Sequence, residues 1–93
     1  MSKSIMQTEK RCYFCDATKA LHRHHVFFGT ANRRLSEKYG CWVWLCFYHH
    51  NGSKDGVHAR KELDLGLKQR TQAKFEETHT REEFMRIFGR SWL

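Results

Sequence analysis

The chain has 93 residues, a length that supports one hydrophobic core and leaves no apolar surface for a second domain. Hydrophobic residues make up 40% of it, and no run approaches the roughly 18 consecutive apolar residues of a membrane span, so we expect no membrane partner. A net charge of +7, from 17 Lys and Arg residues against 10 Asp and Glu residues, favours polyanions such as DNA as partners.

The N-terminal segment differs in character from the rest of the chain. Residues 1–10 are polar and show no periodicity, which predicts a flexible tail, and residues 11–93 are then expected to form the single domain. The segment lacks the apolar middle of a signal peptide, so we expect the protein in the cytoplasm. Cysteines stay reduced in that compartment, and their paired spacing therefore indicates metal binding and not disulfide bonds.

Two short segments have the composition of β-strands. Residues 21–28 end at Gly29, and residues 41–46 are rich in β-branched and aromatic side chains. Residues 33–39, followed by Gly40, favour a short helix or turn between them. The two strands are therefore predicted to pair as a hairpin with a long connection.

The second half of the chain predicts a loop and two helices. Residues 51–56 are the most turn-prone segment, because Gly, Asn, Asp and Ser are all present there. A helix is expected from about residue 57, with one buried apolar stripe at every fourth position. The stripe consists of Ala59, Leu63 and Leu67. Thr80 and Glu83 predict a capping box for a second helix that ends at Gly89.

Two pairs of metal-binding residues share the same two-residue gap. Cys12-x-x-Cys15 places two thiolates on a tight turn, and Cys46-x-x-His49 repeats the spacing further along the chain. Together they predict a Cys3His site for one structural Zn²⁺. The fourth cysteine, Cys41, is interpreted as a core residue, although it is also placed to exchange roles with Cys46.

The remaining histidines are concentrated around the predicted hairpin and the start of the first C-terminal helix. Taken with the zinc-binding pairs, they resemble the HNH, or ββα-metal, nuclease family, over roughly residues 11–61. The family pattern is C-x-x-C, then a histidine that ends the first strand, then C-x-x-C-H leading into a helix. The matching residues are Cys12-x-x-Cys15, His24-His25-Val26 and Cys46-x-x-His49-His50.

This resemblance implies a small α+β domain of the treble-clef type, with a structural zinc knuckle and C-terminal helices. The implied activity is metal-dependent hydrolysis of phosphodiester bonds in DNA, by nicking or by cleavage of both strands. His25 matches the general base of the family, His24 matches a ligand of the catalytic ion, and His50 matches the ligand that opens the helix. His58 is expected to complete this ion site if the loop folds the chain back; a His58 that faces solvent or a phosphate is the alternative.

The chemistry of histidine supports these roles independently. Histidine titrates near neutral pH and can take a proton from water, while a cation stabilises charge on the reacting phosphate. Mg²⁺, Mn²⁺, Ni²⁺ and Zn²⁺ are all candidates for the catalytic ion. Because successive strand residues face opposite sides, His24 and His25 suit one ligand and one base. A chelate of His22 with His24, or histidines that bind no second metal, are the other interpretations.

Further site residues are expected in the connection and around the helix start. The family has an asparagine between its two histidines that orients the base, and Asn32 is the better substitute here, unless it is a simple turn residue. Basic residues close in sequence to the predicted site are candidates for phosphate contacts, although each is also interpretable as an ordinary solvated side chain. They are Arg33, Arg34, Lys38, Lys54, Arg60 and Lys61.

Two other function classes compete with a nuclease. A zinc-finger module that binds nucleic acid without cutting it fits the charge and the knuckle, and so does a zinc-stabilised protein-interaction or inhibitor domain. Cleavage of a plasmid separates the nuclease from both. Within the family resemblance, small members are encoded by phages, which implies work in the host cytoplasm beside larger phage packaging or recombination proteins.

Overall fold

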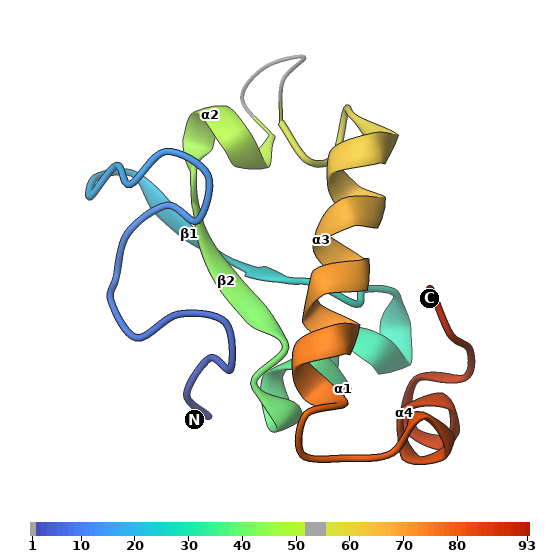
Figure 1. Ribbon diagram of the computed structural model, residues 1–93. Helices are drawn as coiled ribbons and strands as arrows, with labels where there is room; N and C mark the ends of the chain where they lie inside the picture. The colour runs from blue at the N-terminus through green and yellow to red at the C-terminus, as the bar shows by residue number, and fades with distance from the viewer. Residues whose placement is uncertain (1, 52–55) are drawn as a thin grey trace.

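A two-stranded antiparallel hairpin followed by helices organises this α+β fold (Figure 1). The computed structural model describes residues 2–51 and 56–93. The elements, in chain order, are β1 (Leu21–His25), α1 (Thr30–Tyr39), β2 (Trp42–Cys46), α2 (Phe47–His50), α3 (Lys61–Phe75) and α4 (Arg81–Phe88). Among these described residues, no helix is both long and apolar enough to cross a bilayer.

The predicted hairpin is confirmed, with a first strand shorter than the predicted residues 21–28. β1 stops at His25, and the next two side chains, those of Val26 and Phe27, are fully buried in the core. In the register of the hairpin, His24 lies opposite Val43, whereas His25 lies opposite Trp42. Neighbouring residues of a strand point to opposite faces, so these two histidines serve different sides of the sheet.

The connection between the strands forms a full helix, α1, that begins three residues before the predicted start at residue 33. It ends at Gly40, whose φ of 73° is left-handed. A Cβ atom at this position would lie 2.3 Å from the Lys3 carbonyl oxygen, so the site requires glycine. The buried Ser36 hydroxyl donates to the Phe27 carbonyl over 2.6 Å and thereby fixes α1 against the end of β1.

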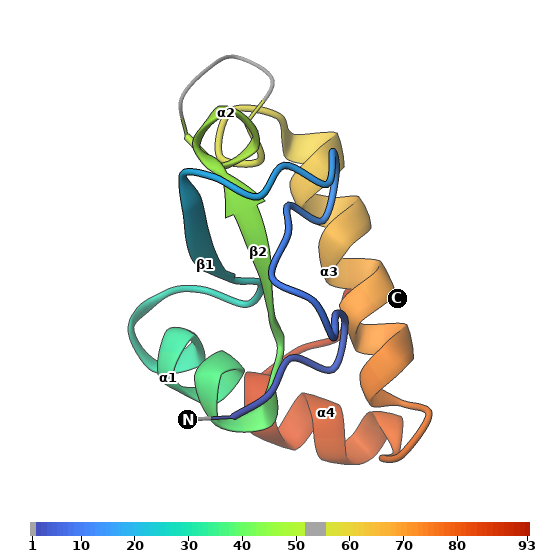
Figure 2. The same ribbon diagram turned by 90° about the vertical axis from the view of Figure 1, so that its left-hand side faces the viewer.

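The two C-terminal helices pack beside the hairpin and across its lower end (Figure 2). α3 begins at Lys61, four residues after the predicted start, because residues before it form turns closed by the Gly56 carbonyl. The predicted capping box of α4 is present: Thr80 accepts from the Glu83 N–H, and the Glu83 side chain accepts from the Thr80 N–H. Gly89 ends this helix in a left-handed conformation, as predicted.

The core lies between β2, α3 and α4. The predicted stripe of α3 is partly confirmed, since Leu67 is fully buried, Leu63 is half-buried and Ala59 is exposed outside the helix. Aromatic rings fill the space between the helices and the end of β1. These rings belong to Phe27, Phe75, Phe84, Phe88 and Trp92.

The N-terminal segment, predicted as a flexible tail, runs along β2 and forms hydrogen bonds on that side of the hairpin (Figure 2). Ile5 donates its N–H to the Gly40 carbonyl over 2.9 Å, and the Gln7 side chain accepts from the Trp44 N–H over 2.8 Å. The Ser4 hydroxyl also donates to the Trp42 carbonyl. These contacts satisfy backbone groups that an edge strand would otherwise expose.

Candidate metal sites and active site

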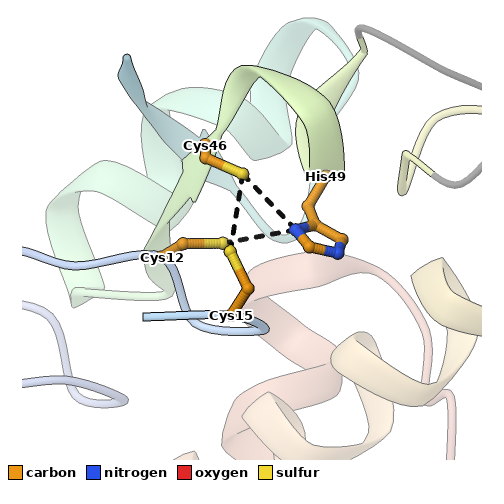
Figure 3. Close-up of side chains that lie close together, drawn as sticks. All are labelled: Cys12, Cys15, Cys46 and His49. Atoms are coloured by element: carbon orange, nitrogen blue, oxygen red, sulfur yellow. Dashed lines mark hydrogen bonds between the residues drawn. The ribbon is translucent and has the colours of Figure 1, made fainter. Parts of the chain in front are cut away.

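The four residues of the predicted zinc knuckle meet at one point, with their side chains turned toward each other (Figure 3). Cys12 and Cys15 stand on a tight turn before β1, Cys46 ends β2, and His49 lies in α2. The Sγ atoms of Cys15 and Cys46 are 3.7 Å apart, and Nδ1 of His49 is 3.4 Å from the Cys46 Sγ and 3.7 Å from the Cys12 Sγ. Zinc–sulfur bonds of about 2.3 Å give tetrahedral edges of about 3.8 Å, so the donor set fits Zn²⁺.

The thiols of this cluster influence one another's pKa, because a negative charge on one disfavours ionisation of the next. Burial would raise the pKa of Cys12, but hydrogen bonds from backbone N–H groups, including that of Cys46, bring it below its usual value. A backbone hydrogen bond from Ala17 lowers the pKa of Cys15, yet burial and the other two thiols raise it to about 11. A bound cation relieves this repulsion, because it stabilises all three thiolates at once.

Cys41 has a different environment and takes no part in the cluster. Its side chain is 0% exposed and belongs to the hydrophobic core, and burial raises the pKa of its thiol to about 12. It therefore stays a neutral core residue, and Cys46 occupies the ligand position, as the spacing to His49 predicted.

A second cluster brings together His24, His50 and His58, which come from β1, α2 and the turn before α3. Nε2 of His50 and Nε2 of His58 are 3.1 Å apart, and the three rings lie 4.7–5.2 Å from one another. His58 therefore lies beside His50, as predicted, while residues 52–55 of the predicted loop lie outside the described residues. Three imidazoles with donor atoms within 4.8 Å of one another can hold one metal ion.

The environment of His24 supports this interpretation. Its side chain is 2% exposed, and its Nε2 has no hydrogen-bond partner within the described part of the chain. A buried polar atom without a partner costs about 1–3 kcal/mol, which coordination to a cation would offset. Burial, followed by the nearby His50 and His58, lowers the pKa of His24 to about 3, and burial lowers that of His50 to about 4. Neutral imidazoles are the form that binds metals.

His22 lies beside this cluster but outside the group of three. Its Nδ1 is 2.9 Å from Nδ1 of His50, so it braces His50 from the side opposite His58. The strand alternation does place His22 and His24 on one face, yet the third member of the group with His24 and His50 is His58. Residues that hold a ligand through its second nitrogen fix the orientation of the ring.

His25 faces the other side of β1 and contacts a carboxylate from α1. Its Nε2 lies 2.9 Å from Oε1 of Glu37, and the second oxygen of Glu37 lies 2.8 Å from Nη1 of Arg23. Sequence reasoning missed both Glu37 and Arg23, because a charged residue on a polar helix or strand is usually a solvated one. The one available signal was the family's orienting asparagine, which implies that some residue of this chain positions His25.

A single pocket joins the histidine cluster to His25. Its lining residues are Arg23, His24, His25, Phe28, Arg33, His50 and His58. His58 is exposed, so the cluster opens to solvent on this side. A second pocket, adjoining at His25 and Arg33, also includes Arg34 and Glu37. A chain of phosphates that passes over His25 would therefore meet two arginines.

The other predicted phosphate contacts lie elsewhere. Lys38 is exposed on α1 with its Nζ 5.4 Å from the centre of the Tyr39 ring, and Lys61 is exposed at the start of α3. Arg60 pairs with Glu62 and lines a pocket beside the zinc knuckle. Lys54 lies outside the described residues. In the part of the chain that the structure describes, only Arg33 and Arg34 of the predicted set border His25.

Asn32, the predicted orienting residue, contacts the C-terminal end of α4. Its Nδ2 donates to the Phe88 carbonyl over 3.4 Å, while His25 is held by Glu37.

Comparisons of the chain with models of protein families, with curated proteins and with solved structures find no match. The two clusters and their geometry are therefore the basis on which a function can be proposed.

Proposed function

We propose that this protein is a metal-dependent DNA endonuclease of the HNH, or ββα-metal, kind. The observation that carries the proposal is the shared pocket, in which a cluster of three imidazoles adjoins His25, a histidine hydrogen-bonded to a carboxylate. Hydrolysis of a phosphodiester needs a cation and a base within reach of one phosphate, and this pocket supplies groups suited to both.

Each residue has a distinct role in the proposed reaction. His24, His50 and His58 would hold the catalytic ion, which stabilises negative charge on the phosphate and on the leaving oxygen. His25 takes a proton from the attacking water. Arg33 binds the phosphate backbone next to the reacting bond, and the net positive charge of the chain favours association with DNA.

The ligand set predicts which ions support activity best. All three donors are imidazole nitrogens, which suit Zn²⁺ and Ni²⁺ better than Mg²⁺, an ion that prefers oxygen ligands. Because of this ligand preference, plasmid cleavage is expected at lower concentrations of Ni²⁺ or Zn²⁺ than of Mg²⁺. The zinc knuckle has a separate, structural role, because it fixes α2 and thereby places His50.

A plasmid assay with metal titration tests the proposal. The zinc-loaded chain and a His24→Ala variant are incubated with supercoiled plasmid in each of the four ions, after removal of loosely bound metal. We expect the parent to convert supercoiled plasmid to nicked or linear forms and the variant to be inactive. A salt-sensitive mobility shift without cleavage in any ion would instead assign the chain to zinc-finger modules that bind DNA, which its net charge also favours.

A further inference from the structure

The contact between His25 and Glu37 joins two elements that are distant in sequence. His25 ends β1, and Glu37 lies in the last turns of α1. The two oxygens of the Glu37 carboxylate are divided between partners: Oε1 faces Nε2 of His25 at 2.9 Å, and Oε2 faces Nη1 of Arg23 at 2.8 Å. The side chain of His25 is 14% exposed, so this contact holds most of its ring inside the protein.

The carboxylate is itself held in place. The Arg23 guanidinium lies 3.9 Å from the centre of the Trp42 ring and 5.4 Å from that of Trp44, which limits its motion. The Trp42 indole N–H donates to the Ser2 hydroxyl over 3.3 Å, and this hydroxyl donates to the backbone carbonyl of Glu37. Glu37 is thus fixed at both its backbone and its side chain.

The chemistry of the pair determines where the proton of His25 resides. Burial would raise the pKa of Glu37, but its hydrogen bonds with His25 and Arg23 lower it, so the group is an ionised carboxylate at neutral pH. An ionised carboxylate only accepts hydrogen bonds. Nε2 of His25 must therefore carry the proton in this contact, and in a neutral imidazole Nδ1 then keeps a free lone pair.

We infer that Glu37 is a positioning residue for His25: its carboxylate fixes the proton on Nε2 and leaves Nδ1 as the nitrogen that accepts the proton of water. The inference rests on the proposed function. In the reaction, water gives one proton to Nδ1 while its oxygen bonds to phosphorus. The bond from phosphorus to the leaving sugar oxygen breaks, and that oxygen takes a proton from solvent. In the resulting imidazolium, the proton stays on Nε2 and remains hydrogen-bonded to the Glu37 carboxylate.

The first test needs no DNA and no activity. In the full zinc-loaded chain, ¹⁵N NMR of the histidine rings distinguishes a protonated ring nitrogen from an unprotonated one. We expect Nε2 of His25 to carry a proton that exchanges slowly with solvent, and Nδ1 to be unprotonated. In Glu37→Ala this slow exchange should disappear. A proton on Nδ1 in the parent, or an unchanged exchange rate in the variant, would overturn the inference.

The second test is kinetic and separates positioning from a general effect on folding. Glu37→Ala should lower kcat about 10–100-fold with little change in KM for plasmid, and Glu37→Gln should recover part of the loss, because the amide oxygen can still accept from Nε2. Glu77→Gln, which makes the same charge change at an exposed pair with Lys74, is the matched control. Zinc content and melting temperature confirm that each variant is folded.

The outcomes distinguish the inference from the proposed function. If the parent does not cleave DNA but its Nε2 proton depends on Glu37, the nuclease proposal fails and the positioning of His25 stands. If the parent cleaves and the folded Glu37→Ala and Glu37→Gln variants retain its kcat, the inference is wrong and the nuclease proposal stands. If Glu37→Ala does not fold, the NMR result on the parent and the kinetics of Glu37→Gln decide.

Discussion

At the scale of single residues, the two adjacent histidines of β1 have opposite environments although they share a side-chain type. His24 is buried, and its Nε2 has no partner among the described residues, whereas Nε2 of His25 is paired with a carboxylate. The first environment suits a metal ligand, and the second suits a group that moves a proton. Strand alternation makes this division possible, because adjacent residues cannot face the same ion.

Loss of His25 should affect chemistry much more than binding. We expect His25→Ala to lower the cleavage rate at least 100-fold, since general bases contribute typically 10²–10⁴-fold. Plasmid affinity should change little, because the proposed function assigns the phosphate contacts to Arg33 and other basic residues. Rates and mobility shifts under the same conditions check both parts. Retention of more than about a hundredth of the parent rate would move the role of base to another residue.

Loss of His58 should affect the ion requirement. It supplies one of three imidazoles and is the exposed member of the cluster, so His58→Ala leaves two ligands in place. We expect the divalent-ion concentration for half-maximal cleavage to rise about 10-fold or more. The structural zinc and the melting temperature in buffer without added metal should not change. His79→Ala, at a histidine stacked on Phe75 far along the chain, is the matched control.

At the scale of elements, the stability of the short helix α2 depends on the contacts that hold its ends. α2 has four residues, far below the length at which an isolated helix is stable in water, so contacts at its ends must supply its stability. His49 is one such anchor, through its approach to the Cys46 and Cys12 thiols. The knuckle therefore supplies stability to this small domain that a larger hydrophobic core would supply in a longer chain.

Removal of a knuckle thiol should unfold the domain. We expect Cys46→Ser to lose the bound zinc together with the cooperative unfolding transition, because the free energy of zinc binding in such sites is free energy of folding. Cys41→Ala is the matched control: it removes a buried thiol outside the cluster and should keep one zinc per chain. Metal analysis and thermal melts measure both effects. A Cys46→Ser variant that melts like the parent would contradict the assignment of the knuckle.

At the scale of the whole molecule, sequence reasoning succeeded where the signal is local. The spacing of Cys12-x-x-Cys15 and Cys46-x-x-His49 fixes the knuckle, and the turn-prone residues 51–56 indicated that His58 could return to His50. It failed where contacts are tertiary. No periodicity or residue spacing in the sequence indicates that Glu37 pairs with His25, or that the N-terminal segment packs on β2.

The net charge of the molecule predicts how DNA binding responds to salt. If recognition is mainly through phosphates, each neutralised phosphate releases counterions, and the binding constant falls steeply with ionic strength. We expect a loss of at least 10-fold between 50 and 200 mM salt for the parent, consistent with a few phosphate contacts. Arg33→Ala should weaken binding and reduce this slope. Mobility shifts across a salt series measure the slope, and a flat response would argue against recognition led by the phosphate backbone.

The consecutive positions of His49 and His50 in α2 join the two clusters through one peptide bond. His49 belongs to the knuckle and His50 to the second cluster, so a helix too short to be stable alone would be shared between two cations if both clusters bind metal. The two binding equilibria would then be linked: the first ion would bear the entropic cost of ordering α2, and the second would bind a preorganised ligand. Oxidation of the knuckle thiols would then reach the pocket as a loss of metal affinity, with no change to any of its own ligands.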